Sequence, residues 1–570
     1  MHPRTLFPAL VALAACHPSA HPGPTANPAT MRQPDTAALA RGIPGLLHTS
    51  GVPGLSMAVV QSGRVIWAGA FGTVNDSAKT PLDTRTIFEA ASLSKPVFAY
   101  IVLRLAGRGE FELDRPLSEM LEYPRLAHDG RYQRITARMV LSHGSGLPNW
   151  GGEQLTLGFD PGTAYGYSGE GFVFLQKVLE RVAGSSLEAL ARRELFEPLG
   201  MTRSSFVWQE RFGGNAAYAK DWPWNVAPVN RYVDANAAYT LLTTAPDYAR
   251  FVAAVLTGRG LSPIMWQEFL TPVRETSPGI HIGLGIRVES GPAGRTFYHS
   301  GNNGRRFTSY MTGNVEKGVG LVYFASATDG TALVEALASP VLGEKHPARH
   351  RAGFDRHDDP RLLAIKSVER AAVERGADAA RARLRSIGAN PATRPTFDAT
   401  LELGAFLARR GLAPLSIEVL EQAVADAPDS ARAHLALGRA LESAGNLQSA
   451  IEAYWRAQTR ETGTGDAQRQ IQWAEERLAA RAQPVAVSRR TLESYVGQYQ
   501  SWAVTLRDGR LYYKGDTKPE SPLVPMEEDL FEVEADPTLR IRFVGAGVGP
   551  AAKLLGVYSD GSAESWARSR

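Results

Sequence analysis

Short runs of β-forming apolar residues occur at two places in the first 345 residues. The runs at 55–60 and 65–71 flank the polar tetrapeptide Gln61-Ser62-Gly63-Arg64, an arrangement typical of a β-hairpin. The runs at 282–288 and 295–299 flank a Ser-Gly-Pro-Ala-Gly turn and predict a second hairpin.

Apolar residues recur at helical spacing elsewhere in the same region. One stretch begins at Ser92 and has a broad apolar face, and another covers 175–182 with apolar positions at i, i+3, i+4 and i+7. Helices mixed with antiparallel hairpins predict an α/β or α+β domain, which we assign to residues 34–345. The His-, Arg- and Asp-rich residues 346–360 are expected to form a linker.

Residues 361–485 are almost wholly helical in pattern and rich in Ala. A set of small and apolar residues recurs 34 residues later, which is the period of tetratricopeptide repeats. The set is Leu403, Gly404, Leu407, Gly411, Leu420 and Ala423, which recurs as Leu437, Gly438, Leu441, Gly445, Tyr454 and Ala457. We expect two repeats capped by helices at 363–386 and 466–481, with generic helical hairpins as the alternative.

The last segment, 486–570, changes to a strand pattern. Residues 504–506 and 511–513 flank Asp508-Gly509, which is a strong hairpin signal. Further short apolar runs follow at 530–533, 539–544 and 554–558. The pattern predicts a small all-β domain, a sheet or barrel.

Length and composition agree with this division of the chain. A chain of 570 residues is too long for a single hydrophobic core. Its apolar fraction of 44% and charged fraction of 21% are those of ordinary globular proteins. The formal charge of +4 gives no strong basic field, and no nucleic-acid-binding motif is present, so we expect no nucleic-acid partner.

The N-terminus has the form of a signal peptide. Arg4 precedes an apolar run, 6–15, that is too short to span a bilayer. The run ends in Leu-Ala-Ala-Cys16, which resembles a bacterial lipobox, and Cys16 is the only cysteine of the chain. We expect residues 1–16 to be a lipoprotein-type signal and 17–33 a tether. The mature protein would be exported and lipid-anchored at Cys16 in the bacterial envelope, facing the periplasm, with an ordinary cleaved signal as the alternative.

Ser92 and Lys95 form the only S-x-x-K sequence of the chain. At helical spacing the two side chains lie on one face, one turn apart. A helix start at Ser92 would place positive charge beside the hydroxyl, and this field together with burial favours a neutral lysine amine. A neutral amine can accept the hydroxyl proton, so this pair is a candidate activated nucleophile.

Two further motifs follow in order. Pro161-Gly-Thr-Ala-Tyr-Gly-Tyr167-Ser-Gly169 precedes the amphipathic helix, and His299-Ser300-Gly301 ends the second hairpin. Together with Glu89-Ala-Ala-Ser92-Leu-Ser-Lys95 they resemble the three motifs of class C β-lactamases, penicillin-binding proteins and their esterase relatives. A fourth likeness is the loop 140–148, in which His143 is expected to be structural. Relatives also often carry a small lipocalin-like domain at the C-terminus, while a helical repeat before it is less usual.

The resemblance implies a β-lactamase/transpeptidase-like fold and a serine hydrolase that works through a covalent acyl-enzyme. Ser92 would attack a carbonyl, while Lys95 and Tyr167 exchange the proton. The backbone N–H groups of Ser92 and Asn302 would bind the oxyanion. His299 would polarise the site or hold a substrate carboxylate. Substrate contacts would come from Ser300, Gly301 and Gly169, and neither a metal nor a cofactor is implied.

Gly169 departs from the family pattern. The tyrosine motif usually ends in Asn, whose amide binds the acylamino group of lactams and peptides, and Gly169 has no side chain to offer. We therefore expect an esterase or a D-peptidase-like enzyme rather than an efficient β-lactamase.

Other classes of protein fit less well. The chain has no G-x-S-x-G elbow and no H-E-x-x-H, and its histidines at 346, 350 and 357 lie in the charged linker. The remaining alternative is a catalytically inactive scaffold or binding protein that holds a protein partner on its tetratricopeptide-like segment.

Overall fold

The computed structural model describes residues 33–75, 80–152, 154–221, 225–303, 306–343, 357–460, 465–500, 502–515, 520–545 and 549–569. The predicted signal and Cys16, and most of the predicted linker with His346 and His350, lie outside these residues. Within the described part, no helix combines the length and the apolar character needed to cross a membrane. The anchoring at Cys16 stays a prediction.

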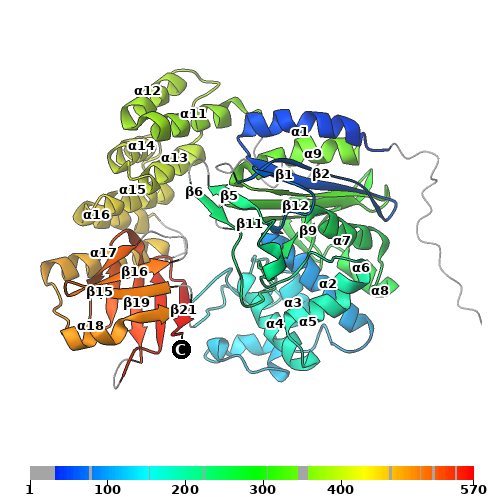
Figure 1. Cartoon of the computed structure of the whole chain (residues 1–570), viewed down its shortest axis with the longest axis horizontal. Helices are drawn as coiled ribbons and strands as arrows, with labels where there is room; N and C mark the ends of the chain where they lie inside the picture. The colour runs from blue at the N-terminus through cyan, green and yellow to red at the C-terminus, as the bar shows by residue number, and fades with distance from the viewer. Residues whose placement is uncertain are drawn as a thin grey trace, which may run out of the picture.

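A nine-stranded antiparallel sheet forms the centre of the first domain (Figure 1). Its strands lie in the order β3-β2-β1-β13-β12-β11-β10-β9-β8. Strands β1 and β13 are far apart in the sequence but pair side by side. Leu55 lies opposite Ala325 and Gln61 opposite Val319, so the two ends of the domain meet in the middle of the sheet. The strand bounds are β1 Gly54–Gln61, β2 Arg64–Asn75, β3 Thr80–Pro81, β8 Arg274–Ser277, β9 Ile280–Ile282, β10 Arg287–Gly291, β11 Gly294–Asn303, β12 Phe307–Asn314 and β13 Val319–Ala325.

Helices cover both faces of this sheet. Alternate residues of β1 point to opposite faces, so Met57 packs in one core cluster and Ala58 in the other. Helices α1 and α9 cover the first face, and α2 and α7 lie in the second core. The helix bounds are α1 Thr36–Ser50, α2 Ser94–Gly107, α3 Ala137–Leu141, α4 Gly169–Ala183, α5 Leu187–Ala191, α6 Glu197–Leu199, α7 Ala245–Thr257, α8 Pro263–Phe269 and α9 Val334–Leu342. Two small ribbons complete the domain: β4 Phe88–Glu89 with β7 Leu242–Thr243, and β5 Tyr218–Asp221 with β6 Asn225–Pro228.

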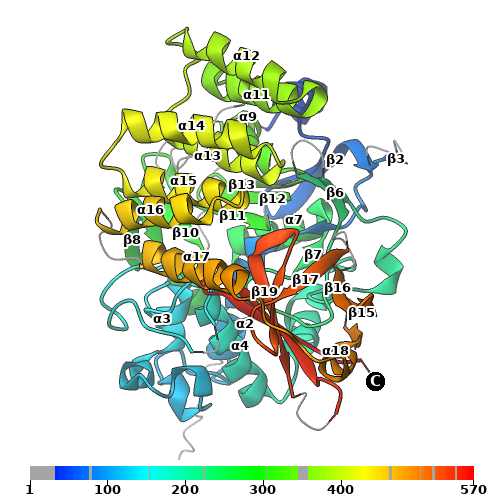
Figure 2. The same cartoon turned by 90° about the vertical axis from the view of Figure 1, so that its left-hand side faces the viewer.

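A stack of helices follows, running down one side of the molecule (Figure 2). The helices α13 and α14 recur as α15 and α16 with the 34-residue offset of the sequence pattern. The matched glycines allow each pair to approach: a Cβ at Gly404 would lie 2.5 Å from Leu420, and one at Gly438 would lie 2.3 Å from Tyr454. The bounds are α11 Pro360–Arg375, α12 Ala377–Gly388, α13 Phe397–Arg409, α14 Ala413–Asp426, α15 Ala431–Ser443, α16 Leu447–Gln458 and α17 Asp466–Ala482.

The C-terminal domain is an eight-stranded antiparallel sheet in simple sequence order, preceded by the short helix α18 (Arg489–Tyr495). A bridge between Tyr499 and Arg568 brings its first strand toward its last, so the sheet is nearly closed around one core. Tyr495 stacks on Phe543 in that core with ring centroids 4.0 Å apart. The strands are β14 Gly497–Tyr499, β15 Trp502–Arg507, β16 Arg510–Gly515, β17 Ser521–Pro525, β18 Leu530–Val533, β19 Asp536–Val544, β20 Lys553–Tyr558 and β21 Ala563–Ala567.

The structure confirms the predicted fold class: an antiparallel sheet flanked by helices, then a helical segment, then an all-β domain. Two expected elements were wrong in detail. Residues 282–288 are not one strand, because the chain turns at Gly285 (φ +93°) between β9 and β10. The expected helix 363–386 is two helices, because Gly376 at φ +84° breaks it.

A buried arginine joins the helical segment to the β-domain. Arg477 of α17 is 3% exposed and pairs with Glu442 of α15 at 2.7 Å and with Glu532 of β18 at 2.6 Å. Tyr454 donates a further hydrogen bond to Glu442 at 2.7 Å. The burial of one cation between two carboxylates requires all three elements to keep these positions.

We expect Arg477→Ala to lower the free energy of unfolding by about 3–5 kcal/mol, because two buried carboxylates would lose their cation. Urea denaturation followed by circular dichroism measures this change, with the exposed Arg489→Ala as the control. A loss below about 1 kcal/mol would mean that water replaces the arginine and that the link is weak.

Candidate active site

Ser92 lies in a tight turn, Ala91–Leu93, directly before α2. The helix was expected to start at Ser92, but α2 begins two residues later, at Ser94. Ala91 has a positive φ of 49°, a strained conformation for a residue with a side chain. The Ser94 hydroxyl supports the turn by donating to the Ala91 carbonyl at 2.7 Å and accepting from the Leu241 amide at 3.0 Å. Ser92 itself remains partly exposed and can be reached from outside.

Lys95 lies beneath Ser92. Its ammonium nitrogen is 3.3 Å from the Ser92 hydroxyl and 3.0 Å from the Ala238 carbonyl, and the side chain is 1% exposed. It also lies 4.8 Å from the centre of the Tyr167 ring. Among the described carboxylates, none forms an ion pair with Lys95. The lysine is therefore held by the serine, a carbonyl and an aromatic ring rather than by a counter-ion.

His143 packs against Tyr167. The two ring centroids are 4.4 Å apart, and Nδ1 of His143 accepts the Ser168 amide at 3.1 Å. The His143 carbonyl accepts the Gly166 amide at 2.8 Å, so this one residue holds the chain on both sides of Tyr167. Ser168 then caps α4 by accepting the Gly171 amide at 2.8 Å. His143 was expected to be structural, and in the structure it positions Tyr167.

The end of β11 passes beside the nucleophile turn. β11 pairs with β12 from Thr296 to Asn303 but with β10 only as far as Tyr298, so residues 299–303 do not pair with β10. A Cβ at Gly301 would lie 2.7 Å from the Ala90 carbonyl oxygen and 2.9 Å from the Ser92 nitrogen. Only glycine allows this approach. Ser300 and Asn302 lie on either side of it in the strand.

Two buried imidazoles lie near Lys95. Burial, together with the charges of Arg287 and Lys95, lowers the pKa of His299 well below 6.5. Burial, with Lys95 and His299, lowers the pKa of His143 in the same way. Both imidazoles are neutral at pH 7, so His299 can donate or accept a hydrogen bond but offers no positive charge to a substrate carboxylate.

A buried carboxylate that sequence reasoning did not assign fixes the surroundings of the site. Glu89 accepts hydrogen bonds from the Asn230 amide at 2.7 Å, the Tyr232 hydroxyl at 2.8 Å and the Asn303 side chain at 2.6 Å. It thereby ties the strand before the nucleophile to the end of β11. Glu89 begins the sequence motif that ends at Lys95, but its three partners are distant along the chain and could not be predicted from that motif.

Trp150 lies where an asparagine side chain would extend from position 169. A Cβ at Gly169 would be 2.6 Å from Cη2 of Trp150 and 2.8 Å from the Asn149 carbonyl oxygen. The Trp150 ring is 45% exposed and meets Tyr239 edge to face at 5.5 Å. No periodic signal in the sequence indicates this pair.

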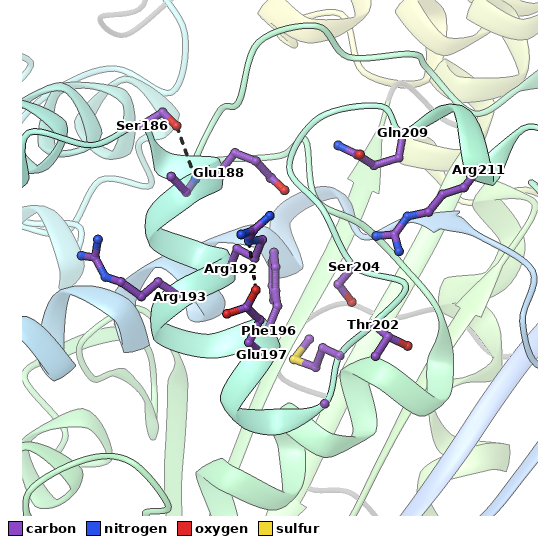
Figure 3. Close-up of a pocket in the computed structure, with 13 residues that line it drawn as sticks. Ser186, Glu188, Arg192, Arg193, Phe196, Glu197, Thr202, Ser204, Gln209 and Arg211 are labelled. Atoms are coloured by element: carbon purple, nitrogen blue, oxygen red, sulfur yellow. Dashed lines mark hydrogen bonds and ion pairs between the residues drawn. The ribbon is translucent and has the colours of Figure 1, made fainter.

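The structure therefore brings Ser92, Lys95, Tyr167, Gly301 and the ends of β11 and α4 together. A cavity of about 1020 Å³ lies elsewhere, around α5 and the Arg192–Glu197 ion pair (Figure 3). None of the residues that line it is a predicted site residue. No group of three potential ligands among the described histidines and acids has the arrangement to hold a metal ion.

The neutral state of His143 predicts a pH-dependent stability. Because its pKa is lower in the folded protein than in the unfolded chain, the unfolded chain takes up the proton first as the pH falls. The free energy of unfolding should then decrease below about pH 6.5. His143→Gln should flatten this slope by up to about 1.4 kcal/mol per pH unit between pH 6.5 and 5.

Urea denaturation at several pH values measures the slope, with the exposed His48→Gln as the matched control. An equal slope in wild type and His143→Gln would show that the buried imidazole is not the proton acceptor on unfolding.

Two curated proteins are similar to part of this chain. Penicillin-binding protein 4* of Bacillus subtilis (strain 168) is 24% identical over 319 residues, 49% of this chain and 69% of that protein. Esterase EstB of Burkholderia gladioli is 32% identical over 184 residues, 27% of this chain and 46% of that protein. This chain thus spans less than half of the esterase.

Two solved structures also align with this chain. A class C beta-lactamase aligns with a TM-score of 0.47 at 21% identity, over 51% of this chain and 91% of that one. An octameric penicillin-binding protein homologue from Pyrococcus abyssi aligns with a TM-score of 0.46 at 17% identity, over 92% of this chain and 98% of that one. The sequence profile named Beta-lactamase matches residues 39–340, more than half of the 570 residues. The chain belongs to the Beta-lactamase family of serine hydrolases.

Proposed function

We propose that the protein is an esterase that hydrolyses carboxylic esters through an acyl-enzyme on Ser92, and that it is a poor β-lactamase. The observation that carries this proposal is the Trp150 ring beside Gly169. An apolar ring stands where an amide would bind an acylamino group, so the acyl side of the site favours an apolar chain. A D-peptidase-like activity shares the nucleophile but would need that missing polar contact.

The nucleophile is activated by Lys95. The side-chain nitrogen of Lys95, 3.3 Å from the Ser92 hydroxyl, takes the proton as the oxygen forms its bond to the substrate carbonyl carbon. The carbonyl electron pair moves onto oxygen, where the amide of Ser92 and, by its place after the third motif, that of Asn302 are proposed to donate hydrogen bonds.

The leaving group departs with a proton relayed from Lys95 through Tyr167. The Tyr167 ring lies 4.8 Å from the lysine nitrogen and packs on His143, which supports this role. Collapse of the tetrahedral intermediate breaks the bond to the alcohol and leaves the acyl group on Ser92. Water then attacks the same carbonyl and gives its proton to the base. The bond between the acyl carbon and Ser92 Oγ breaks, Oγ takes the proton from the base, and the acid leaves.

The alternative is a non-catalytic binding protein. A cavity of about 1370 Å³ between α13, α15, α17 and strands β17–β19 offers space for a peptide of a protein partner. The exposed Arg439 and Arg481 line this cavity and form no ion pair with the residues that the structure describes. Their charge favours an acidic segment. Absence of acylation by the intact protein would favour this function.

The first test is covalent labelling. Ser92 should react with a fluorophosphonate and turn over p-nitrophenyl butyrate, and Ser92→Ala should lose both, with turnover falling by at least about 10³-fold. Tyr167→Phe should lower kcat by about 10²–10⁴-fold while labelling persists, because the nucleophile remains. Full turnover in Ser92→Ala would disprove the proposed mechanism.

The second test exchanges the residue beside Trp150. Gly169→Asn should reduce ester kcat/KM at least tenfold, because the new side chain and the indole cannot occupy one place. Trp150→Ala combined with Gly169→Asn should raise ester turnover from that of Gly169→Asn to that of Trp150→Ala, and should raise acylation by a fluorescent penicillin above that of either single variant.

Gly184→Asn is the matched control, because no atom lies within 4 Å of its Cβ position and asparagine tolerates the left-handed φ of 60° there. If Gly169→Asn alone hydrolyses esters as the wild type does, Trp150 does not define the acyl side of the site.

A further inference from the structure

The turn between β20 and β21 of the C-terminal domain is held against the first domain. On one side, Gln470 of α17 donates to the Ser559 carbonyl at 2.6 Å. On the other side, the Gly561 carbonyl oxygen lies 3.3 Å from the position that a Cβ at Gly152 would take. Figure 1 shows the loop before α4 reaching β21 at this point.

The loop that meets this turn is fixed. Arg125 pairs with Glu170 at 2.6 Å and donates to the carbonyls of Gly151 and Gly152. Glu170 also accepts the Gly151 amide at 3.2 Å. Gly152 is two residues from Trp150, so the β-domain contacts the same loop that carries the aromatic wall of the acyl side.

β21 carries a carboxylate on the side that meets this loop. Glu564 is exposed, forms no ion pair with the described residues, and interacts with the Tyr558 hydroxyl at 3.4 Å. Burial first, and then the charges of Glu564 and Glu89, raise the pKa of Tyr239. Glu564 follows Gly561, whose carbonyl oxygen meets the Trp150 loop at Gly152, by three residues along the chain, so it lies on the same side as the aromatic pair.

We propose that Trp150, Tyr239 and Glu564 form a subsite for an organic cation, namely an ammonium group at the far end of the substrate's acyl chain. The exposed Trp150 ring and the half-buried Tyr239 ring attract an ammonium through their quadrupoles, and the Glu564 carboxylate adds a direct charge interaction. An anionic acyl chain is repelled at the same place. This inference rests on the proposed function, since it names the class of acyl group.

Matched p-nitrophenyl esters test the subsite. The cationic members are 4-(trimethylammonio)butyrate and 6-(trimethylammonio)hexanoate, and their neutral isosteres are 5,5-dimethylhexanoate and 7,7-dimethyloctanoate. The monoester of glutarate is the anionic member. At one chain length or the other, wild-type kcat/KM should be about fivefold or more higher for the cationic ester than for its isostere, and lowest for glutarate.

Glu564→Gln should bring the ratio of cationic to neutral ester close to one, and Glu564→Lys should reverse it. Trp150→Ala should lower kcat/KM for both esters. Glu493→Gln and Glu493→Lys, which change charge on the exposed face of α18, are the matched controls and should leave the ratio unchanged. A ratio that Glu564→Gln leaves unchanged at both chain lengths would overturn the subsite.

Failure of the subsite differs from failure of the proposed function. Ester turnover without charge discrimination would disprove only the subsite. If no ester is turned over, isothermal titration calorimetry can still test the subsite. It compares the affinities of the 4-(trimethylammonio)butyryl amide and the 5,5-dimethylhexanoyl amide. Tighter binding of the cationic amide that is lost in Glu564→Gln supports the subsite, and equal binding of the two amides overturns it.

Discussion

The close approach of β11 to the nucleophile turn is the constraint on which the rest of the site depends. Gly301 lies so near Ala90 and Ser92 that any side chain there would displace one of them. Ser309 of β12 donates to the Ala90 carbonyl at 2.6 Å, and Glu89 binds Asn303. Because the turn is held from both sides, Ala91 can keep a strained φ and present the Ser92 hydroxyl next to Lys95.

Local patterns in the sequence predicted the parts of the site that depend on short spacing. Ser92 and Lys95 are one helical turn apart, and the tyrosine motif precedes the amphipathic helix whose N-terminus Ser168 caps. The place of Gly301 beside the nucleophile could be expected from its motif, but the reason for a glycine there became visible only with the strand in place.

What the sequence could not supply are contacts between distant segments. Gly169 ends the tyrosine motif and Trp150 follows the loop 140–148. Their contact depends on how these two segments fold together. The same holds for Glu89 with Asn230 and Tyr232. The breaks at Gly285 and Gly376 were missed because apolar residues continue through them, and the period of a pattern does not report a positive φ.

The helical segment is tied to the chain at both of its ends. Lys366 of α11 binds the Ser50 carbonyl at 2.8 Å and Asp329 at 3.0 Å in the first domain, while Arg477 and Trp473 of α17 bind the β-domain. The β20–β21 turn therefore reaches Gly152 across a span set by the stacked helices. Because this turn meets the loop that carries Trp150, adding or removing a pair of stacked helices would change the distance between the β-domain and that loop.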